Sequence, residues 1–360
     1  MDAEPATVAE LGEFALIDVL AETLAAVGAT SSTGDAAPLL GIGDDAAAWT
    51  PTPGARALIT TDSLIGGVHF RLDWTSWRDL GHKALAVNLS DVAAMGGRPR
   101  LAVVTLGLTG AEPVAGLREL YRGLGLLARR YQTAIAGGDI VASPDRFGLH
   151  VTVVGESWPE AEGRLLTRDG ARPGDLLAVS GPLGLSAAGL RLLLARESVP
   201  GAAQSLEPLP AGERAMLAAH HRPQPRIECG RLLVEAGATA AMDLSDGLWG
   251  DLAKICARSK VAARVVELAL PAPESVRQRF PDSWLDLATR GGEDYELLFT
   301  IAPEAFAALT RQCQERDLPL PVAIGRIVPP DDNTAPIVLR RADGREEPVQ
   351  GGAFDHFAHG

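Results

Sequence analysis

The stretch ALITTDS, residues 57–63, joins a strand pattern to an aspartate. ALITT is short, apolar and rich in β-branched residues, which is typical of a buried strand. Such a strand would present Thr60, Thr61 and Asp62 at its end. Ligands of α/β proteins commonly bind beyond the ends of strands. We therefore expect this strand to lead into a ligand site.

Five further segments set aspartate beside glycine or small hydroxyl residues. They are GIGDDA (41–46), NLSDVAAMGG (88–97), AGGDI (136–140), DLSDG (243–247) and GGEDYEL (291–297). Carboxylates supply the oxygen ligands that Mg²⁺ prefers, and glycine lets backbone and phosphate approach closely. Proteins commonly hold Mg²⁺ with one or two carboxylates together with substrate phosphates. The set therefore indicates several Mg²⁺ ions and nucleotide chemistry.

Each of these segments also has a purely structural interpretation. Asp beside Gly is common in turns, and Ser or Asp before a helix is a common N-cap. Six such segments in one chain, several of them after apolar strands, favour a binding site over unrelated turns. The familiar phosphate motifs are absent, because the sequence has no GxxxxGK[ST] loop and no kinase catalytic loop. GLGLLA (123–128) mimics a dinucleotide fingerprint but lies inside a helical pattern.

Composition limits the class of protein. The chain has 360 residues, 46% of them hydrophobic, which fits two domains with sizeable cores. A net charge of −13 argues against electrostatic binding to nucleic acid or to an anionic membrane. Cys229, Cys256 and Cys313 lack metal-site spacing, so we expect buried thiols in a reducing compartment. The acidic N-terminus lacks the pattern of a signal peptide and no membrane-length apolar stretch occurs, which predicts a soluble, cytoplasmic protein.

Strands and helices alternate irregularly along the chain. The patterns predict helices over 10–27, 78–95, 112–131, 184–196, 226–236 and 247–258, and strands over 57–61, 101–108, 133–139, 149–156 and 238–246. The predicted fold class is therefore α/β (or α+β), with two domains and mixed sheets. We expect a boundary near 157–164, giving domains 1–160 and 161–360. Asp91 would lie late in a mostly buried helix, where a carboxylate needs a partner.

Two short matches hint at an internal repeat. Ser90-Asp91 recurs at Ser245-Asp246, and Gly137-Gly138 recurs at Gly291-Gly292, at nearly the same offset. Duplicated ancestry and coincidence both explain them. Since both halves contribute acidic segments in either case, we expect both to contribute to the site.

Taken together, the segments resemble the thiamine-monophosphate kinase family. The resemblance rests on GEFALID (12–18), LGIGDDAA (40–47), TTDSLIGGVHF (60–70), LGHKALAVNLSDVAAMGGRP (80–99), AGGD (136–139), MDLSDGL (242–248), GGEDYELLFT (291–300) and FDHF (354–357). It implies the fold of the aminoimidazole ribonucleotide synthetase superfamily, with an N-terminal ATP- and Mg-binding domain that forms a homodimer through its sheet. The C-terminal domain would complete the site. The implied reaction is direct Mg-assisted transfer of the ATP γ-phosphoryl group to thiamine monophosphate, giving thiamine diphosphate.

The resemblance also implies roles for individual residues. Mg²⁺ would be held by Asp45, Thr60, Thr61, Asp62, Asp91, Asp139 and Asp243, with a further ion on Asp246. ATP would contact Gly138, Asp139, Arg164 and Ser245. Thiamine phosphate would contact His69, Glu293 and Phe354. Asp62, Asp91 and Asp139 would be the catalytic carboxylates, and Asp44 would support Asp45.

Three of these residues also have a plainer interpretation. Arg164 fits a solvated surface residue, His69 a ring packed beside Phe70, and Phe354 an aromatic that docks the tail. The chain also departs from the family at Ile140, where a Thr often follows GGD, and at AMGGRP (94–99). Neither change removes a carboxylate.

Several other functions compete with this one. Selenophosphate synthetase needs a cysteine near the N-terminus, whereas the first cysteine here is Cys229. The hydrogenase maturation dehydratase ends in a cysteine that this chain lacks. Aminoimidazole ribonucleotide synthetase lacks the HF and GGEDYEL contexts. A non-catalytic nucleotide- or cation-binding regulator is the alternative outside catalysis.

Overall fold

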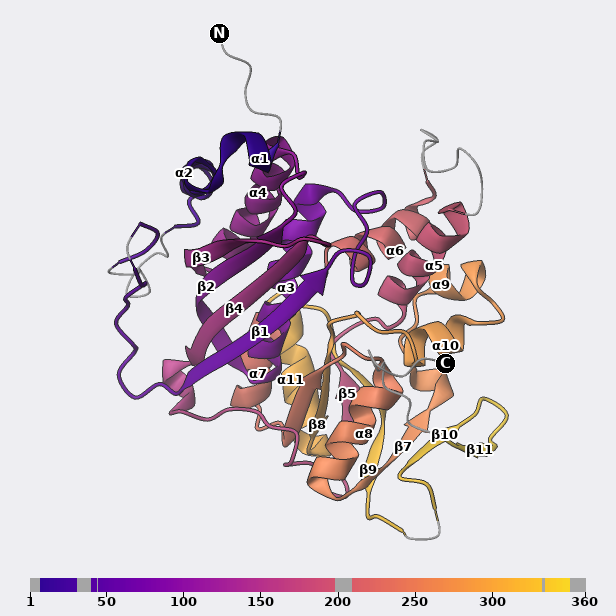
Figure 1. Cartoon of the computed structure of the whole chain (residues 1–360). Coiled ribbons are helices and arrows are strands. Elements are labelled where there is room, and N and C mark those ends of the chain that lie inside the picture. Colours follow the sequence, from indigo (N-terminus) through magenta and orange to yellow (C-terminus); the bar gives the residue numbers. More distant parts are fainter. Residues whose placement is uncertain (1–6, 31–39, 44, 198–208, 332–333, 350–360) are drawn as a thin grey trace. The chain divides into compact units, whose positions relative to one another are not determined.

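The computed structural model describes residues 7–30, 40–43, 45–197, 209–331 and 334–349 and divides the chain into two compact units (Figure 1). Unit 1 comprises Met1–Val92 and Gly97–Gly163, and unit 2 comprises Ala93–Gly96 and Arg164–Gly360. The elements of unit 1 are α1 (Val8–Leu11), α2 (Glu13–Ala26), β1 (Ala57–Ile65), α3 (Trp77–Ala94), β2 (Gly97–Leu108), α4 (Val114–Arg130), β3 (Ala134–Ala142), β4 (Gly148–Ser157) and η1 (Pro159–Ala161).

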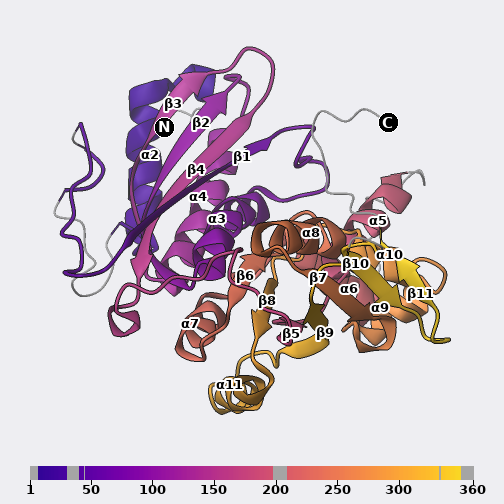
Figure 2. The ribbon, with the colours of Figure 1, turned by 90° about the horizontal axis from the view of Figure 1, so that it is seen from below.

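Unit 1 is a four-stranded sheet with helices on one side. The strand order is β1-β4-β2-β3, and β2 and β3 are parallel while the other neighbours are antiparallel. Helices α3 and α4 lie on the same side of this sheet (Figures 1 and 2). They approach closely, because a Cβ at Gly123 would lie only 1.9 Å from the carbonyl oxygen of Arg78. GLGLLA is therefore part of helix α4, and Gly123 serves helix packing.

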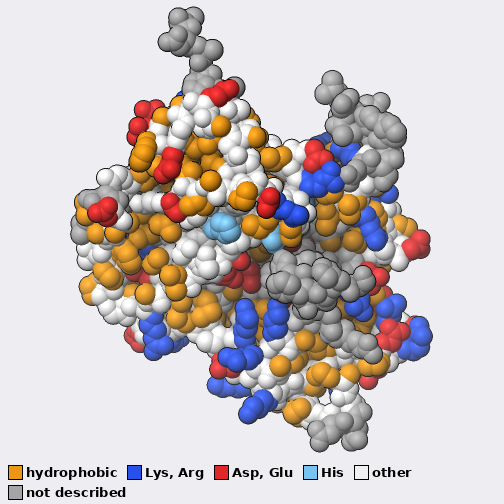
Figure 3. Space-filling model, viewed as in Figure 1, with side chains coloured by type: hydrophobic (Ala, Val, Ile, Leu, Met, Phe, Trp, Pro, Cys, Tyr) orange, Lys and Arg blue, Asp and Glu red, His pale blue; other side chains and the backbone are white. Residues whose placement is uncertain are grey.

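The other face of the unit 1 sheet is open and partly apolar. Ile59 on β1 is 75% exposed, and Val103 on β2 and Val141 on β3 are also exposed. Hydrophobic side chains gather on this part of the surface in Figure 3. An apolar sheet face without a covering layer is typical of an interaction surface.

Unit 2 is built around a larger mixed sheet. Its elements are β5 (Leu176–Val179), α5 (Leu185–Glu197), α6 (Ala211–His221), α7 (Ile227–Glu235), β6 (Ala240–Asp243), α8 (Leu248–Ser259), β7 (Ala262–Val266), η3 (Glu267–Ala269), α9 (Glu274–Arg279), α10 (Trp284–Thr289), β8 (Leu297–Ile301), α11 (Pro303–Glu315), β9 (Val322–Val328), β10 (Ile337–Arg340) and β11 (Glu346–Pro348). The strand order is β11-β10-β7-β9-β5-β8-β6, and only β10 and β7 are parallel among these described pairs.

Helices cover both faces of this second sheet. On one face, Trp249, Leu252 and Ile255 of α8 pack on Val265 and Leu298 in a buried cluster. Helices α7 and α11 lie on the other side of the sheet (Figure 2). The fold is thus mixed α/β with two mixed sheets, as the sequence predicts. All three cysteines are buried, as expected.

The sequence located the long elements better than the short ones. The predicted strand 57–61 extends to Ile65, and helices α3, α4 and α8 begin within two residues of their predicted starts. The predicted helix 10–27 is divided into α1 and α2 at Gly12, which has φ 84°. Strands β5, β10 and β11 were not predicted, because strands of three or four residues give little periodicity, and the seven-residue β9 was also missed. Within the described part of the chain, no helix combines the length and apolarity of a bilayer span.

The two halves of the apparent repeat occupy different kinds of element. Ser90-Asp91 lies inside helix α3, whereas Ser245-Asp246 lies in the turn before α8. Gly137-Gly138 lies in strand β3, whereas Gly291-Gly292 precedes strand β8. These matches therefore do not align equivalent elements of the two units.

Candidate functional site

Three of the predicted metal ligands meet between β1 and α3. Thr60 and Asp62 are two residues apart on β1 and so lie on the same face of the strand. The Thr60 hydroxyl donates a hydrogen bond of 2.5 Å to Asp91 Oδ2 near the end of α3. The Thr60 hydroxyl of β1 is thus one partner of Asp91, the carboxylate expected to need a partner in a mostly buried helix.

The carboxylates of this cluster are close enough to interact. Burial and, to a smaller extent, the negative charge of Asp91 raise the pKa of Asp62 from 3.8 to about 6. A divalent cation would offset both effects, because it favours the ionised form of a nearby carboxylate. Two carboxylates and a hydroxyl also match the oxygen ligands of Mg²⁺. Thr60, Asp62 and Asp91 therefore fit a Mg²⁺ site.

This site needs oxygen ligands beyond the acidic side chains. Among the residues that the structure describes, no three His, Cys, Asp or Glu side chains form a group that could hold a metal ion. Mg²⁺ usually keeps several waters and takes substrate phosphates as ligands. The donor set is thus suited to an ion that arrives with a phosphate-bearing substrate.

Thr61 and Asp139 lie on the other face of the unit 1 sheet. Thr61 neighbours Asp62 on β1, so its side chain points to the opposite side. Asp139 is exposed and belongs to the register row Asp139–Thr105–His150–Ser63, and Ser63 shares the face of Thr61. Strands β1 and β3 are opposite edges, three strand spacings of about 4.8 Å apart. Within one chain, the sheet therefore does not bring Asp139 to Asp62.

Gly138 has a structural reason to be glycine. A Cβ at this position would lie 1.9 Å from the carbonyl oxygen of Val104 on β2. At Gly137 the nearest atom to such a Cβ is 3.9 Å away, an ordinary contact. Strand packing alone requires glycine at 138, and its contact with ATP stays a prediction.

His69 supports the turn that follows β1. Its Nδ1 accepts a hydrogen bond of 3.1 Å from the backbone N–H of Ile65. The adjacent Phe70 is buried and packs edge-on against Phe147, with ring centroids 5.6 Å apart. The His69 ring is therefore held in place by the turn, and its role toward a substrate stays a prediction.

The remaining predicted residues, apart from those of the segments DLSDG and GGEDYEL, are exposed or lie outside the described part of the chain. Asp45 is exposed in the loop that the pairing of Leu40 with Ala48 closes. Arg164 is exposed at the start of the second stretch of unit 2. Asp44 and Phe354 lie outside the described residues.

In unit 2, the segments DLSDG and GGEDYEL lie side by side. The Glu293 N–H donates to the Ser245 carbonyl, the Tyr295 N–H to the Leu244 carbonyl, and the Leu244 N–H to the Glu296 carbonyl, at 2.8 to 2.9 Å. Glu293 and Tyr295 have φ values of 66° and 51°, which cost on the order of 1 kcal/mol each for L-residues. The hydrogen bonds to the neighbouring turn hold this strained backbone.

The turn 243–247 is stabilised by two residues that the sequence did not single out. These residues are Asp251 and Lys254. The predicted metal ligand Asp243 is itself buried at the end of β6. Asp251 accepts hydrogen bonds from the N–H groups of Ser245 and Asp246 at 3.1 and 3.0 Å. Lys254 forms an ion pair with Asp246. The only sequence signal was an acidic residue in the first turn of α8, where it suits exposed N–H groups.

Asp294 belongs to the segment GGEDYEL but has no role in the predicted site. Its carboxylate accepts hydrogen bonds from the N–H groups of Gly184 and Ser186 at 2.7 and 3.2 Å, at the start of α5. Burial raises the pKa of Asp294 to about 7, and the neighbouring glutamates act in the same direction. The predicted substrate residue Glu293 places Oε2 3.4 Å from His220 Nδ1 of α6.

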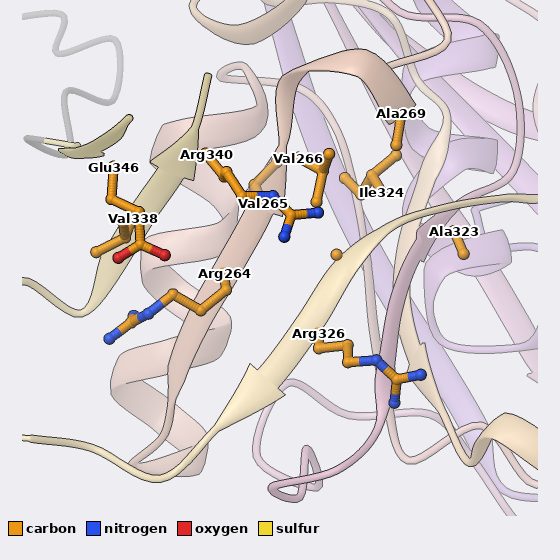
Figure 4. Close-up of a pocket in the computed structure, with 11 residues that line it drawn as sticks. Arg264, Val265, Val266, Ala269, Ala323, Ile324, Arg326, Val338, Arg340 and Glu346 are labelled. Carbon is orange, nitrogen blue, oxygen red and sulfur yellow. The ribbon is translucent and has the colours of Figure 1, made fainter. Parts of the chain in front are cut away.

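A cavity of about 350 Å³ lies elsewhere in unit 2, between strands β7, β9 and β10 (Figure 4). Arg264, Arg326 and Arg340 line it together with Glu346. Arg264 and Arg326 are register partners on β7 and β9, and in Figure 4 their guanidinium groups point away from each other. None of the predicted site residues belongs to its lining.

The comparisons with known proteins identify the family of this chain. Two family models match: "AIR synthase related protein, N-terminal domain" over residues 43–157 and the corresponding C-terminal domain over residues 172–337. The thiamine-monophosphate kinase of Bacillus subtilis (strain 168) is 34% identical over 318 residues, which cover 88% of this chain and 93% of that protein. This chain belongs to the thiamine-monophosphate kinase family. The resemblance seen in the sequence is thus confirmed.

Solved structures of the kinase family share the fold. The thiamine-monophosphate kinase of Stenotrophomonas maltophilia K279a is 37% identical, with a TM-score of 0.78 over 92% of this chain and 97% of that chain. A structure described as AaThiL complexed with AMPPCP and TMP is 32% identical, with a TM-score of 0.72 over 97% and 98% of the two chains. Hydrogenase maturation protein HypE in complex with ATP, at 24% identity and a TM-score of 0.69 over 89% and 90%, shares the fold alone.

Proposed function

We propose that this chain transfers the γ-phosphoryl group of ATP to thiamine monophosphate and so forms thiamine diphosphate. The observation that carries the proposal is the cluster of Thr60, Asp62 and Asp91 in a member of the thiamine-monophosphate kinase family. The relative solved with AMPPCP and TMP supports the choice of substrates. We further propose that the transfer is in-line and assisted by Mg²⁺.

The chemistry of the reaction suits an acidic site that gathers cations. Both reactants are phosphates and repel each other, and metal ions shared between their oxygens offset this repulsion. The acceptor phosphate is already anionic, so no strong general base is needed. The contribution of the protein is then positioning and neutralisation of charge. Asp62 and Asp91 would hold the cations, and the Thr60 hydroxyl would fix the orientation of Asp91.

The remaining assignments extend this site by family resemblance. The ligands of Mg²⁺ are Asp45, Thr60, Thr61, Asp62, Asp91, Asp139 and Asp243. ATP is bound by Gly138, Asp139, Arg164 and Ser245, and thiamine phosphate by His69, Glu293 and Phe354. In unit 1, ions and ATP bind at the sheet. In unit 2, the paired turns 243–247 and 291–297 provide further contacts with the substrates.

We also propose that the kinase is a homodimer formed through the open face of the unit 1 sheet. Exposed Ile59, Val103 and Val141 on that face support it, because such apolar surface is normally covered. Ile59→Asp should produce a monomer in light scattering. Leu268→Asp is the matched control, since Leu268 is 74% exposed in unit 2 and the change should leave the dimer intact. A wild-type monomer at micromolar concentration would contradict the proposal.

The activity is tested directly by measuring ADP and thiamine diphosphate. Purified protein is mixed with MgATP and thiamine monophosphate, with free thiamine and EDTA samples as controls. We expect equal amounts of both products from the monophosphate alone, and none with EDTA. ATP binding without any product would instead favour a nucleotide-binding regulator that retains the fold.

A further inference from the structure

Lys254 of α8 lies between two carboxylates of the turn 243–247 and its following helix. Its Nζ is 2.6 Å from Asp246 Oδ2 and 2.8 Å from Asp251 Oδ1. Both contacts lie within unit 2. The side chain of Lys254 is about two-thirds buried, since its exposed fraction is 35%. Lys254 thus bridges the carboxylates of Asp246 and Asp251.

Asp251 explains why this positive charge is needed. Its side chain has no exposed surface, and its Oδ2 accepts the N–H groups of Ser245 and Asp246. Its Oδ1 accepts the ammonium of Lys254. Burial raises the pKa of Asp251, and Lys254 acts against that increase. Without Lys254, the carboxylate that shapes the turn would be a buried charge without its cation.

The same ammonium conflicts with a metal ion on Asp246. A Mg²⁺ ion binds oxygen at about 2.1 Å, so an ion on Asp246 Oδ2 would lie within roughly 5 Å of Nζ. Two cations that close repel each other, and the ammonium already occupies one approach to the oxygen. The donor set around Asp246 therefore does not fit the further Mg²⁺ that the family resemblance implies.

We infer that Lys254 takes the place of that Mg²⁺ ion, so that Asp246 binds no metal in this chain. The fixed ammonium neutralises Asp246 and Asp251 together and keeps the turn 243–247 in shape. The inference concerns the further Mg²⁺ ion expected on Asp246. It rests on the proposed function only for that expectation.

The test counts bound Mn²⁺, a probe for Mg²⁺, by electron paramagnetic resonance with and without a non-hydrolysable ATP analogue. Asp246→Asn should leave the number of bound ions unchanged from wild type. Lys254→Met should bind one more ion per chain, and Lys254→Met/Asp246→Asn should lose that added ion. Lys260→Met, which removes an exposed lysine at the end of α8, is the matched control and should behave as wild type.

Loss of one ion from wild type on Asp246→Asn would overturn the inference. If Lys254→Met does not fold, the comparison of wild type with Asp246→Asn still decides the question. The count of ions does not depend on turnover. A failure of the kinase assay therefore leaves this result intact, and a contrary ion count leaves the proposed kinase activity standing.

Discussion

At the scale of single residues, Asp62 shows a conflict between function and stability. Its raised pKa means that the ionised form, which a metal needs, is disfavoured in the metal-free fold. The neighbouring Asp91 adds to the effect, and Thr60 orients Asp91. In the metal-free protein, the ionised carboxylate of Asp62 is therefore unfavourable, and a bound cation would make it favourable.

We predict that Asp62→Asn lowers turnover by about a hundredfold or more, because a group that stabilises charge at the reacting phosphates is lost. In EDTA near neutral pH, the same change should raise Tm by about 1–4 °C, since it removes a disfavoured buried charge. Thermal unfolding and the product assay measure the two effects. Asp73→Asn, at an exposed site paired with Arg71, is the control and should change neither turnover nor Tm. A lower Tm for Asp62→Asn would contradict this explanation.

Asp294 predicts a pH dependence of stability. Its pKa rises from 3.8 to about 7 on folding, so its contribution to stability is fully present below the lower value and is lost as pH rises through the upper one. Asp294→Asn cannot ionise. The change in Tm between about pH 5.5 and pH 8.5 should therefore be smaller in this variant than in wild type. Identical pH profiles for the two proteins would show that Asp294 does not titrate in this range.

At the scale of elements, close backbone approach explains several of the glycines. Gly123 lets α4 approach α3, and Gly138 lets β3 lie against β2. The sequence pattern Gly-Gly-Asp suggested a phosphate contact at this point of β3. The structure adds a packing requirement that the motif by itself does not reveal.

Two alanine variants separate these explanations. Gly138→Ala should destabilise the protein by about 2 kcal/mol or more, because its Cβ would overlap the Val104 carbonyl. Gly137→Ala, one residue away, should cost less than about 1 kcal/mol, since its Cβ meets only an ordinary contact. Urea unfolding measures both. If Gly138→Ala were as stable as wild type but bound ATP weakly, the glycine would serve the nucleotide and not the strand.

At the scale of the whole molecule, the position of Asp139 bears on the proposed dimer. It lies on the opposite face and the opposite edge of the sheet from Asp62, yet both are assigned to the same reaction. The open face that carries Asp139 is the one proposed to meet a second copy. Asp139 would then lie at the interface with that second copy, and mixing variants decides whether it serves the site of that copy.

Mixing two inactive variants tests this arrangement. Asp62→Asn and Asp139→Asn are combined after subunit exchange, and each alone serves as its own control. If the two residues act in sites shared between copies, half of the dimers carry one intact site, and activity should return to about a quarter of wild type. If both residues belong to one chain's site, the mixture stays inactive.

Sequence alone determined the class of fold and the family, and it proposed the carboxylates of the site. The strand ALITT, the long helices and the acidic segments are local patterns, and local patterns survive without knowledge of tertiary contacts. They also identified Asp62 and Asp91 as candidates for one site, which the Thr60–Asp91 hydrogen bond supports.

Only the tertiary structure decided which of these residues meet. Strand order and side-chain alternation separate Asp139 from Asp62, and both depend on pairings between distant segments. The same holds for Asp246, whose ion partner Lys254 comes from the next helix and whose turn is held by Asp251. A motif names the residue types in a site, but charge, burial and distance are properties of neighbours that folding brings together.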